Sequence, residues 1–175
     1  MSETTQPEPW LRGTLTEISP VPRAVLHALE LAKEDLTRWC GNLNDEQLNA
    51  RPADVAPIAF HIRHIARSVD RLLTYAEGNQ LNEEQLTALN NELTPDATRH
   101  DVFTELNTTL AKCATRIAQI DPARSDEPRY VGKKQLPTTV GGLLVHIADH
   151  TQRHVGQAIT TTKIVTALRT GTRWP

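Results

Sequence analysis

Apolar side chains recur every three or four residues in four long stretches of the chain, and this spacing predicts four α-helices. The first stretch begins after Pro20 and ends at Gly41-Asn42, and the others cover about 56–77, 98–120 and 138–168. No long alternating β-branched segment predicts a strand. We therefore predict an all-α protein, an up-and-down four-helix bundle. The apolar stripes are Val25, Leu29, Ala32, Leu36 and Trp39; Ile58, Ile62, Ile65, Val69 and Leu72-Leu73; Val102, Leu106, Leu110, Cys113 and Ile117; and Val140, Leu143-Leu144, Ile147, Val155, Ile159 and Ile164.

Short extra helices are expected between the long ones. Asp45 through Leu48 predicts one helical turn with Asp45 as its cap, and Asn82-Glu-Glu-Gln predicts the start of a short helix that ends before Pro95. Gly141-Gly142 lies in the first turns of the last helix, where each glycine costs roughly 1 kcal/mol relative to alanine. We expect another backbone or a ligand to approach closely there, and a weak start to the helix is the alternative.

Two segments lie outside the helical pattern. Residues 1–19 are interpreted as an N-terminal arm that reaches over the body, and residues 20–170 as a single bundle domain. The polar stretch 121–137 holds no clear helix, although Tyr130-Val131 favours a brief extended piece. Loops of this length are often functional, so it could cover a site. The candidate anchors of the arm are Trp10, Leu11, Leu15 and Ile18.

Composition narrows the class of protein. The chain has 175 residues, with 19 Lys and Arg against 21 Asp and Glu, and no basic stripe of the kind that binds nucleic acid. No apolar run approaches the roughly 20 residues of a membrane span. The N-terminus lacks the features of a signal peptide, so a cytoplasmic location is expected. Cys40 and Cys113 lie among apolar neighbours and are interpreted as small buried hydrophobic residues.

Histidines supply the candidate chemistry. His150 and His154 are spaced i, i+4, which on a helix places both on one face, close enough to bind one ion. Neutral imidazole is the commonest metal ligand at neutral pH and suits Zn, Ni, Cu and Fe. His27 and His100 lie near helix starts and are interpreted as surface residues. The other five occur in two predicted helices: His61, His64, His146, His150 and His154.

The residues alone leave two readings open. In the first, a third metal ligand comes from the second helix, where His61 and His64 both lie near the edges of the apolar stripe. In the second, the histidines are buried and hydrogen-bonded to carbonyls or acids, and Asp149, Asp70 and Glu77 are the candidate acids.

Two segments carry a resemblance to a known family. Leu144-Val-His-Ile-Ala-Asp-His-Thr-Gln-Arg-His-Val-Gly-Gln157 resembles the last-helix motif of the DinB-like family, and Ile62-Arg-His-Ile-Ala-Arg-Ser68 resembles its second-helix motif. With the four helices, the resemblance covers about 22–168. It implies a four-helix bundle, commonly a homodimer, with a divalent Zn or Ni ion on His64, His150 and His154. His61 and His146 become neighbours of the site.

The resemblance also implies a class of reaction. Three imidazoles leave an open coordination position for water or a thiol. We expect a metal-dependent enzyme with a small-molecule substrate that transfers or activates a low-molecular-weight thiol such as bacillithiol or mycothiol. Hydrolysis at the same site is one alternative, and a non-catalytic, stress-related binding protein with a structural metal is another. The candidate substrate-binding residues are Arg153, Gln157, His61 and His146, with Arg63 as a further candidate for a carboxylate. Many family members have histidine where this chain has Arg153, which would favour a different, anionic substrate.

Overall fold

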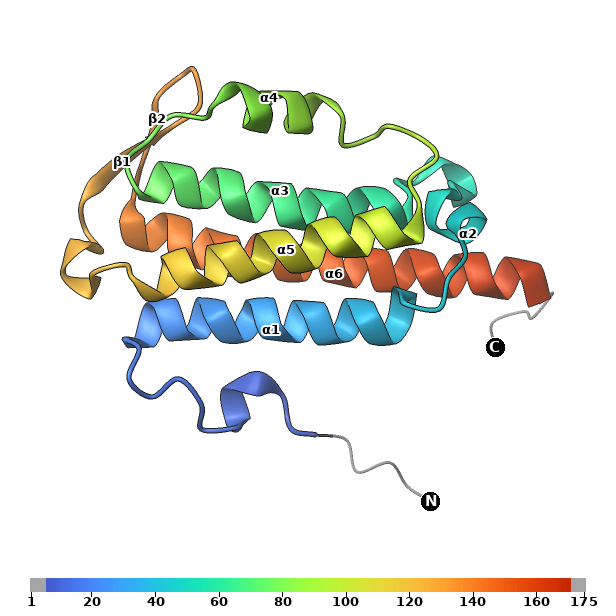
Figure 1. Ribbon diagram of the computed structural model, residues 1–175, viewed down its shortest axis with the longest axis horizontal. Helices are drawn as coiled ribbons and strands as arrows, with labels where there is room; N and C mark the ends of the chain where they lie inside the picture. The colour runs from blue at the N-terminus through green and yellow to red at the C-terminus, as the bar shows by residue number, and fades with distance from the viewer. Residues whose placement is uncertain (1–5, 171–175) are drawn as a thin grey trace.

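The computed structural model describes residues 6–170, with side chains to residue 168, and shows a bundle of four long helices (Figure 1). The all-α prediction is confirmed. The long helices are α1 (Pro20–Cys40), α3 (Ile58–Ala76), α5 (Arg99–Ala118) and α6 (Val140–Thr170). The shorter elements are the helices α2 (Asp45–Asn49) and α4 (Glu83–Asn90), an antiparallel hairpin of β1 (Pro128–Val131) and β2 (Leu136–Thr139), and 3-10 turns at Pro9–Leu11, Pro52–Asp54 and Pro122–Arg124.

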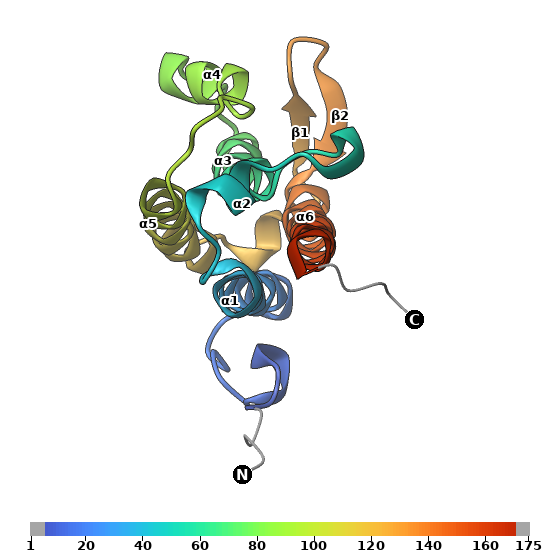
Figure 2. The same cartoon turned by 90° about the vertical axis from the view of Figure 1, so that its right-hand side faces the viewer.

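The order of the helices around the bundle differs from their order along the chain. Helix α6 packs against both α1 and α3, and α5 packs against the other side of the same two helices. Figure 2, which looks along the bundle, shows α1 opposite α3 and α5 opposite α6. Helix α4 carries the chain back along the bundle, so α3 and α5 run in the same direction (Figure 1). The extensive packing of α3 on α6 brings the two histidine-bearing segments together.

The predicted apolar stripes form one continuous core. Two residues of those stripes, Trp39 and Ile164, are exposed instead. The Trp39 ring lies on the surface beneath the Lys163 ammonium group, 4.7 Å from the ring centroid, a cation–π arrangement that keeps the aromatic face partly covered. The largest fully buried side chains are Leu36, Leu48, Ile58, Ile62, Ile65, Leu73, Leu106, Ile117, Leu144, Ile147, Val25 and Val69.

The N-terminal arm is attached differently from the prediction. Residues 1–5 lie outside the described part of the chain. Trp10 and Leu11 are exposed and do not anchor the arm, whereas Leu15 and Ile18 pack against the core as predicted. Ion pairs also attach the arm, because Arg12 binds Glu30 at 2.9 Å and Glu34 at 2.7 Å on α1.

The arm also explains why the prediction for His27 was wrong. His27 is buried, and its Nε2 atom lies 3.1 Å from the Thr14 hydroxyl of the arm. Because the arm covers this part of α1, a histidine near a helix start is not at the surface here. His100 is exposed, as predicted.

Two helix starts show how local sequence sets the short elements. Asn44, not Asp45, caps α2, and Asn82 caps α4; each asparagine side chain accepts from the backbone N–H of a glutamine three residues later. That glutamine side chain in turn accepts from the backbone N–H of the asparagine, which completes a capping box. Asp45 instead lies in the first turn of α2, where its negative charge interacts favourably with the helix dipole.

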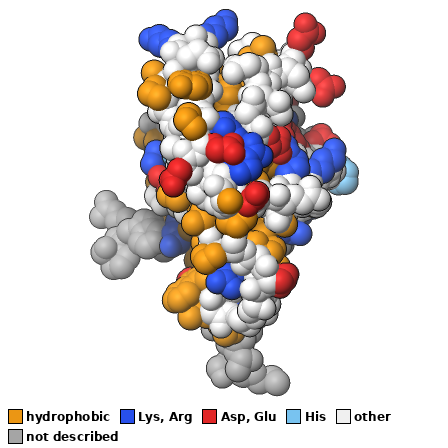
Figure 3. Space-filling view, turned by 90° about the vertical axis from the view of Figure 1, so that its left-hand side faces the viewer, with side chains coloured by type: hydrophobic (Ala, Val, Ile, Leu, Met, Phe, Trp, Pro, Cys, Tyr) orange, Lys and Arg blue, Asp and Glu red, His pale blue; other side chains and the backbone are white. Residues whose placement is uncertain are grey.

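The segment 121–137 closes one end of the bundle. It contains the hairpin, of which Tyr130-Val131 is part, as the sequence favoured. Arg129 donates to the Ala76 carbonyl at the end of α3, at 2.7 Å. Arg124 and Arg129 both pair with Glu127, and Figure 3 shows acidic and basic side chains lying together at this end. By helical rise, this end lies about 18 Å along α3 from His64. These contacts give no support to the expectation that the loop covers the histidines.

The predicted close approach at the start of α6 is present. A Cβ atom on Gly141 would lie 3.1 Å from the Ser125 carbonyl oxygen, and the Gly141 N–H donates to that same oxygen at 2.8 Å. Among the described residues, no helix combines the length and the apolar character that a membrane span requires.

Candidate metal centre

Three histidines from two antiparallel helices converge at the middle of the bundle. His64 comes from α3, and His150 and His154 come from successive turns of α6. One ring nitrogen from each lies within 4.8 Å of the others, and this is the cluster of three potential metal ligands found among residues 6–168. The i, i+4 spacing on α6 produces the arrangement, because it stacks two imidazoles on the face that packs against α3.

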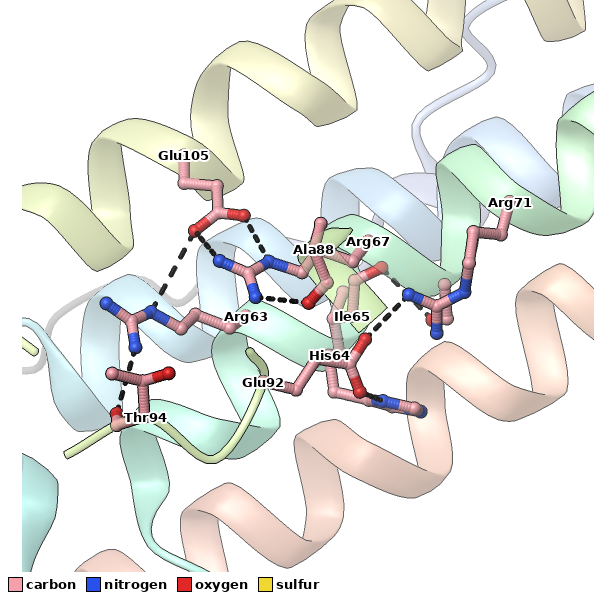
Figure 4. Close-up of polar contacts among 10 residues, drawn as sticks. Arg63, His64, Ile65, Arg67, Arg71, Ala88, Glu92, Thr94 and Glu105 are labelled. Atoms are coloured by element: carbon pink, nitrogen blue, oxygen red, sulfur yellow. Dashed lines mark hydrogen bonds and ion pairs between the residues drawn. The ribbon is translucent and has the colours of Figure 1, made fainter. Parts of the chain in front are cut away.

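A buried carboxylate determines which nitrogen of His64 faces the cluster. The Nδ1 atom of His64 lies 2.6 Å from Glu92 Oε2 (Figure 4). Its Nε2 atom lies 2.8 Å from His150 Nε2. A carboxylate only accepts hydrogen bonds, so we assign the proton of His64 to Nδ1. The lone pair of Nε2 then points toward the other two histidines, as a metal ligand requires.

His154 has a comparable partner in His61. The two Nδ1 atoms lie 3.0 Å apart, and His61 is buried on α3, one turn before His64. His61 is therefore a neighbour of the cluster, and its contact with Nδ1 helps to orient the ring of His154. This contact uses Nδ1 of His154 and leaves its Nε2 atom as the nitrogen available to a metal ion.

Burial favours the neutral form of His61, His150 and His154. Burial, followed by repulsion from neighbouring charged groups, lowers the pKa of His150 to about 4 and that of His154 to about 3. Burial, followed by repulsion from His64, lowers the pKa of His61 to about 4. Neutral imidazole is the form that binds a metal.

The donor set fits a divalent ion that prefers nitrogen ligands. Three neutral imidazoles suit Zn or Ni better than Mg or Ca, which take oxygen ligands. In addition, His150 Nδ1 is buried and has no hydrogen-bond partner within the described part of the chain. A buried polar atom without a partner is costly in a folded protein, so the surroundings of His150 are not those of a histidine placed for hydrogen bonding alone.

Other predicted site residues lie outside the cluster. Arg153 and Gln157 are exposed on α6. His146 is also exposed and pairs with Asp149 at 2.9 Å, although its ring lies 5.2 Å from that of His150. Arg153 pairs with Asp149 at 3.5 Å, and its charge contributes to the lowered pKa values of His150 and His154, so it lies near the cluster without being one of the three potential ligands.

Of the three acids considered from sequence, Asp149 binds a histidine, His146, and the other two bind an arginine. Asp70 and Glu77 both pair with Arg116 of α5, at 2.6 and 2.7 Å. The acid that contacts the cluster is Glu92, which sequence reasoning missed. It lies in the polar connection after α4, where no periodicity marks a residue as buried.

Phe60 is a second residue that sequence reasoning missed. Its ring stacks on His64, with 5.3 Å between centroids and 24° between planes, and lies edge-on to His61 and His154. It covers one side of the histidine cluster. Its position beside His61, in a chain with only two phenylalanines, was an available signal.

Three arginines on successive turns of α3 attach the α4 region beside the cluster (Figure 4). Arg63 donates to the Thr94 carbonyl at 3.2 Å, and Arg67 donates to the Ala88 carbonyl at 2.7 Å and also binds Glu105. Arg71 donates to Glu92 Oε1 at 2.6 Å. Arg63 is mostly buried against Thr94 and Glu105, although its Nε atom has no hydrogen-bond partner among the described residues, so its guanidinium is not presented at the surface to a substrate carboxylate in this arrangement.

Metal sites in helical bundles are built from side chains on facing helices, and three imidazoles on two adjacent helices place this protein in that class. The chain belongs to the DinB superfamily, whose sequence profile matches residues 28–158. Among solved structures, it is similar to YfiT from Bacillus subtilis, with a TM-score of 0.63, 14% identity, and coverage of 87% of this chain and 89% of that one. YfiT is described as a probable metal-dependent hydrolase with an unusual four-helix bundle topology. No protein with a curated description matches the sequence.

Proposed function

We propose that this protein is a metal-dependent hydrolase of a small-molecule substrate, with a divalent Zn or Ni ion held by His64, His150 and His154. The observation that carries the proposal is the convergence of three imidazole nitrogens within 4.8 Å, with no fourth ligand in that cluster among residues 6–168. Three protein ligands are typical of catalytic zinc sites, whereas structural sites are filled by four.

The chemistry divides between the ion and the chain. A bound divalent ion would supply Lewis acidity, which favours the deprotonated form of water or of a thiol. The chain supplies orientation, because Glu92 holds His64 and His61 holds His154. Phe60 covers one side of the histidines and limits the access of water from that direction.

Two observations favour hydrolysis over the thiol transfer that the family resemblance implies. The description of YfiT names hydrolysis. Thiol cofactors such as bacillithiol and mycothiol are polar, and an anionic thiol cofactor needs free cations near the metal. The arginines of α3 beside the cluster are already bound to Glu92, Glu105 and backbone carbonyls. Thiol transfer therefore becomes the second candidate, and the same assay separates the two.

The test begins with the full chain stripped of metal and reloaded with Zn or Ni. Elemental analysis should find about one equivalent, as a single three-histidine site requires. The loaded protein is then screened against esters, amides and other hydrolysable compounds, with and without added bacillithiol or mycothiol. Hydrolysis supports the proposal if it needs metal and no thiol, and if His64→Ala and His154→Ala abolish it. His100→Ala, which changes an exposed histidine on α5, is the matched control.

Other outcomes would redirect the assignment. Turnover that strictly requires a thiol would replace hydrolysis by thiol transfer. A loaded protein that is active on no compound, but melts at a lower temperature without metal, would indicate a non-catalytic binding protein with a structural ion. A homodimer remains a prediction, and light scattering on the same samples measures the oligomeric state.

A further inference from the structure

We propose that Glu92 is a positioning residue of the metal site, and that it makes the connection between α4 and α5 part of that site. The inference rests on the proposed function, because it concerns how the chain prepares His64 to bind the ion. Glu92 acts through His64 and is not itself a metal ligand.

The first argument is the burial of Glu92. Only 6% of the residue is exposed, although it lies in a connection whose other residues, apart from Ala97, are exposed from Asn91 to Thr98. A carboxylate is rarely this buried unless it is paired. Both of its oxygens are used, one by His64 Nδ1 and the other by Arg71, each at 2.6 Å. The connection therefore turns one charged side chain inward, toward the histidines.

The second argument is chemical. Histidines that bind metals usually donate their other N–H to a carboxylate or a carbonyl, which fixes the tautomer and makes the ligand nitrogen more basic. Glu92 fulfils this role for His64, because its hydrogen bond to Nδ1 leaves Nε2 unprotonated toward His150. Arg71 donates to the other oxygen of Glu92 and gives the buried carboxylate a cationic partner, which holds it in place beside His64.

The third argument is the way in which the connection is held. Thr94 in the connection offers its backbone carbonyl to Arg63, two turns of α3 before Arg71, and Ala88 in α4 offers its carbonyl to Arg67, one turn before Arg71. These contacts bring Glu92 to His64 from 28 residues further along the chain. A change that detached the connection from α3 would therefore remove the carboxylate from the metal ligand.

The test compares two carboxylates that both bind arginines of α3. Glu92→Gln removes the charge at His64, whereas the matched control Glu105→Gln removes a charge that, among the described side chains, pairs with Arg63 and Arg67 and not with a histidine. Zn or Ni affinity is measured on the full chain by competition with a chromogenic chelator. We expect Glu92→Gln to weaken binding about 10- to 100-fold and Glu105→Gln to change it less than about threefold.

A second readout does not depend on metal. In the metal-free protein labelled with ¹⁵N-histidine, long-range ¹H–¹⁵N correlation reports which ring nitrogen carries the proton. Wild-type His64 should be protonated at Nδ1, and Glu92→Gln should shift the ring toward a mixture of tautomers, which a merely structural role would not do. If Glu92→Gln does not fold, the double change Arg71→Met with Glu92→Gln removes both buried charges together and takes its place in both measurements.

The outcomes separate this inference from the proposed function. Weakened binding and an altered tautomer in the Glu92 variant alone would support it. Unchanged affinity in that variant, or an equal loss in Glu105→Gln, would overturn it and leave the three-histidine site intact. A wild-type protein that takes up no Zn or Ni would overturn the proposed function, and this inference with it.

Discussion

Replacement of Ile147 by alanine tests whether α6 is rotated so that its histidines face α3. Ile147 is fully buried, at 0% exposure. On an α-helix, His154 lies about 20° around the axis from Ile147, whereas Val145 lies about 160° away. Val145 is accordingly 58% exposed. If Ile147 lies in the core and Val145 lies at the surface, α6 is rotated about its axis so that His154 faces inward.

The expected cost follows from the atoms removed. Isoleucine to alanine deletes three carbons, and at about 0.8 kcal/mol for each buried methylene this loses roughly 2.4 kcal/mol. Incomplete collapse of the cavity adds to this, so the expected total is about 3–4 kcal/mol, within the usual range for such changes. At 2–4 °C per kcal/mol for a domain of this size, Ile147→Ala should melt about 6–16 °C below the wild type.

The assay is chemical and thermal denaturation of the metal-free protein, with unfolding monitored by circular dichroism. Val145→Ala is the control, and it should change the free energy of unfolding by less than about 0.5 kcal/mol. Metal-free protein is used so that lost binding cannot be confused with lost packing. A larger loss for Val145→Ala than for Ile147→Ala would show that α6 is rotated differently, which would refute the placement of the histidines.

Two further predictions concern the metal and the thiols. Zn or Ni at about 100 times its dissociation constant should stabilise the protein by about 2.7 kcal/mol. Differential scanning fluorimetry should show a rise in melting temperature for the wild type but not for His64→Ala or His154→Ala. An equal rise in all three proteins would contradict the ligand assignment. Cys40 and Cys113 are buried, and burial raises both pKa values, that of Cys113 to about 12. Because the thiolate is the reactive form, neither thiol should react with Ellman's reagent near pH 8 until denaturant is added; rapid labelling of the native protein would show that one of them is accessible.

The long helices could be predicted from sequence because their apolar residues repeat with the helical period over many turns. The same periodicity placed His150 and His154 on one face, and the structure confirms that they lie together with His64. Periodicity could not show that α1 and α3 lie diagonally across the bundle, since that depends on the return of the chain through α4.

The parts that escaped prediction depend on contacts between distant segments. Glu92 is buried because its carboxylate accepts hydrogen bonds from Arg71 and His64, and neither partner is near it in sequence. His27 is buried because the N-terminal arm folds over it, and Trp39 is exposed although it continues an apolar stripe. In each case a tertiary contact, or its absence, overrides the local pattern.

The packing of α6 against both α1 and α3 has a consequence for biosynthesis. Helix α6 follows the other long helices along the chain and carries two of the three clustered histidines. A nascent polypeptide that has emerged only as far as α5 would leave exposed the apolar parts of α1 and α3 that α6 covers, the kind of surface that chaperones shield. Metal could not be captured at the three-histidine site during this stage. Acquisition of the ion would therefore be a late step of maturation, after translation of α6.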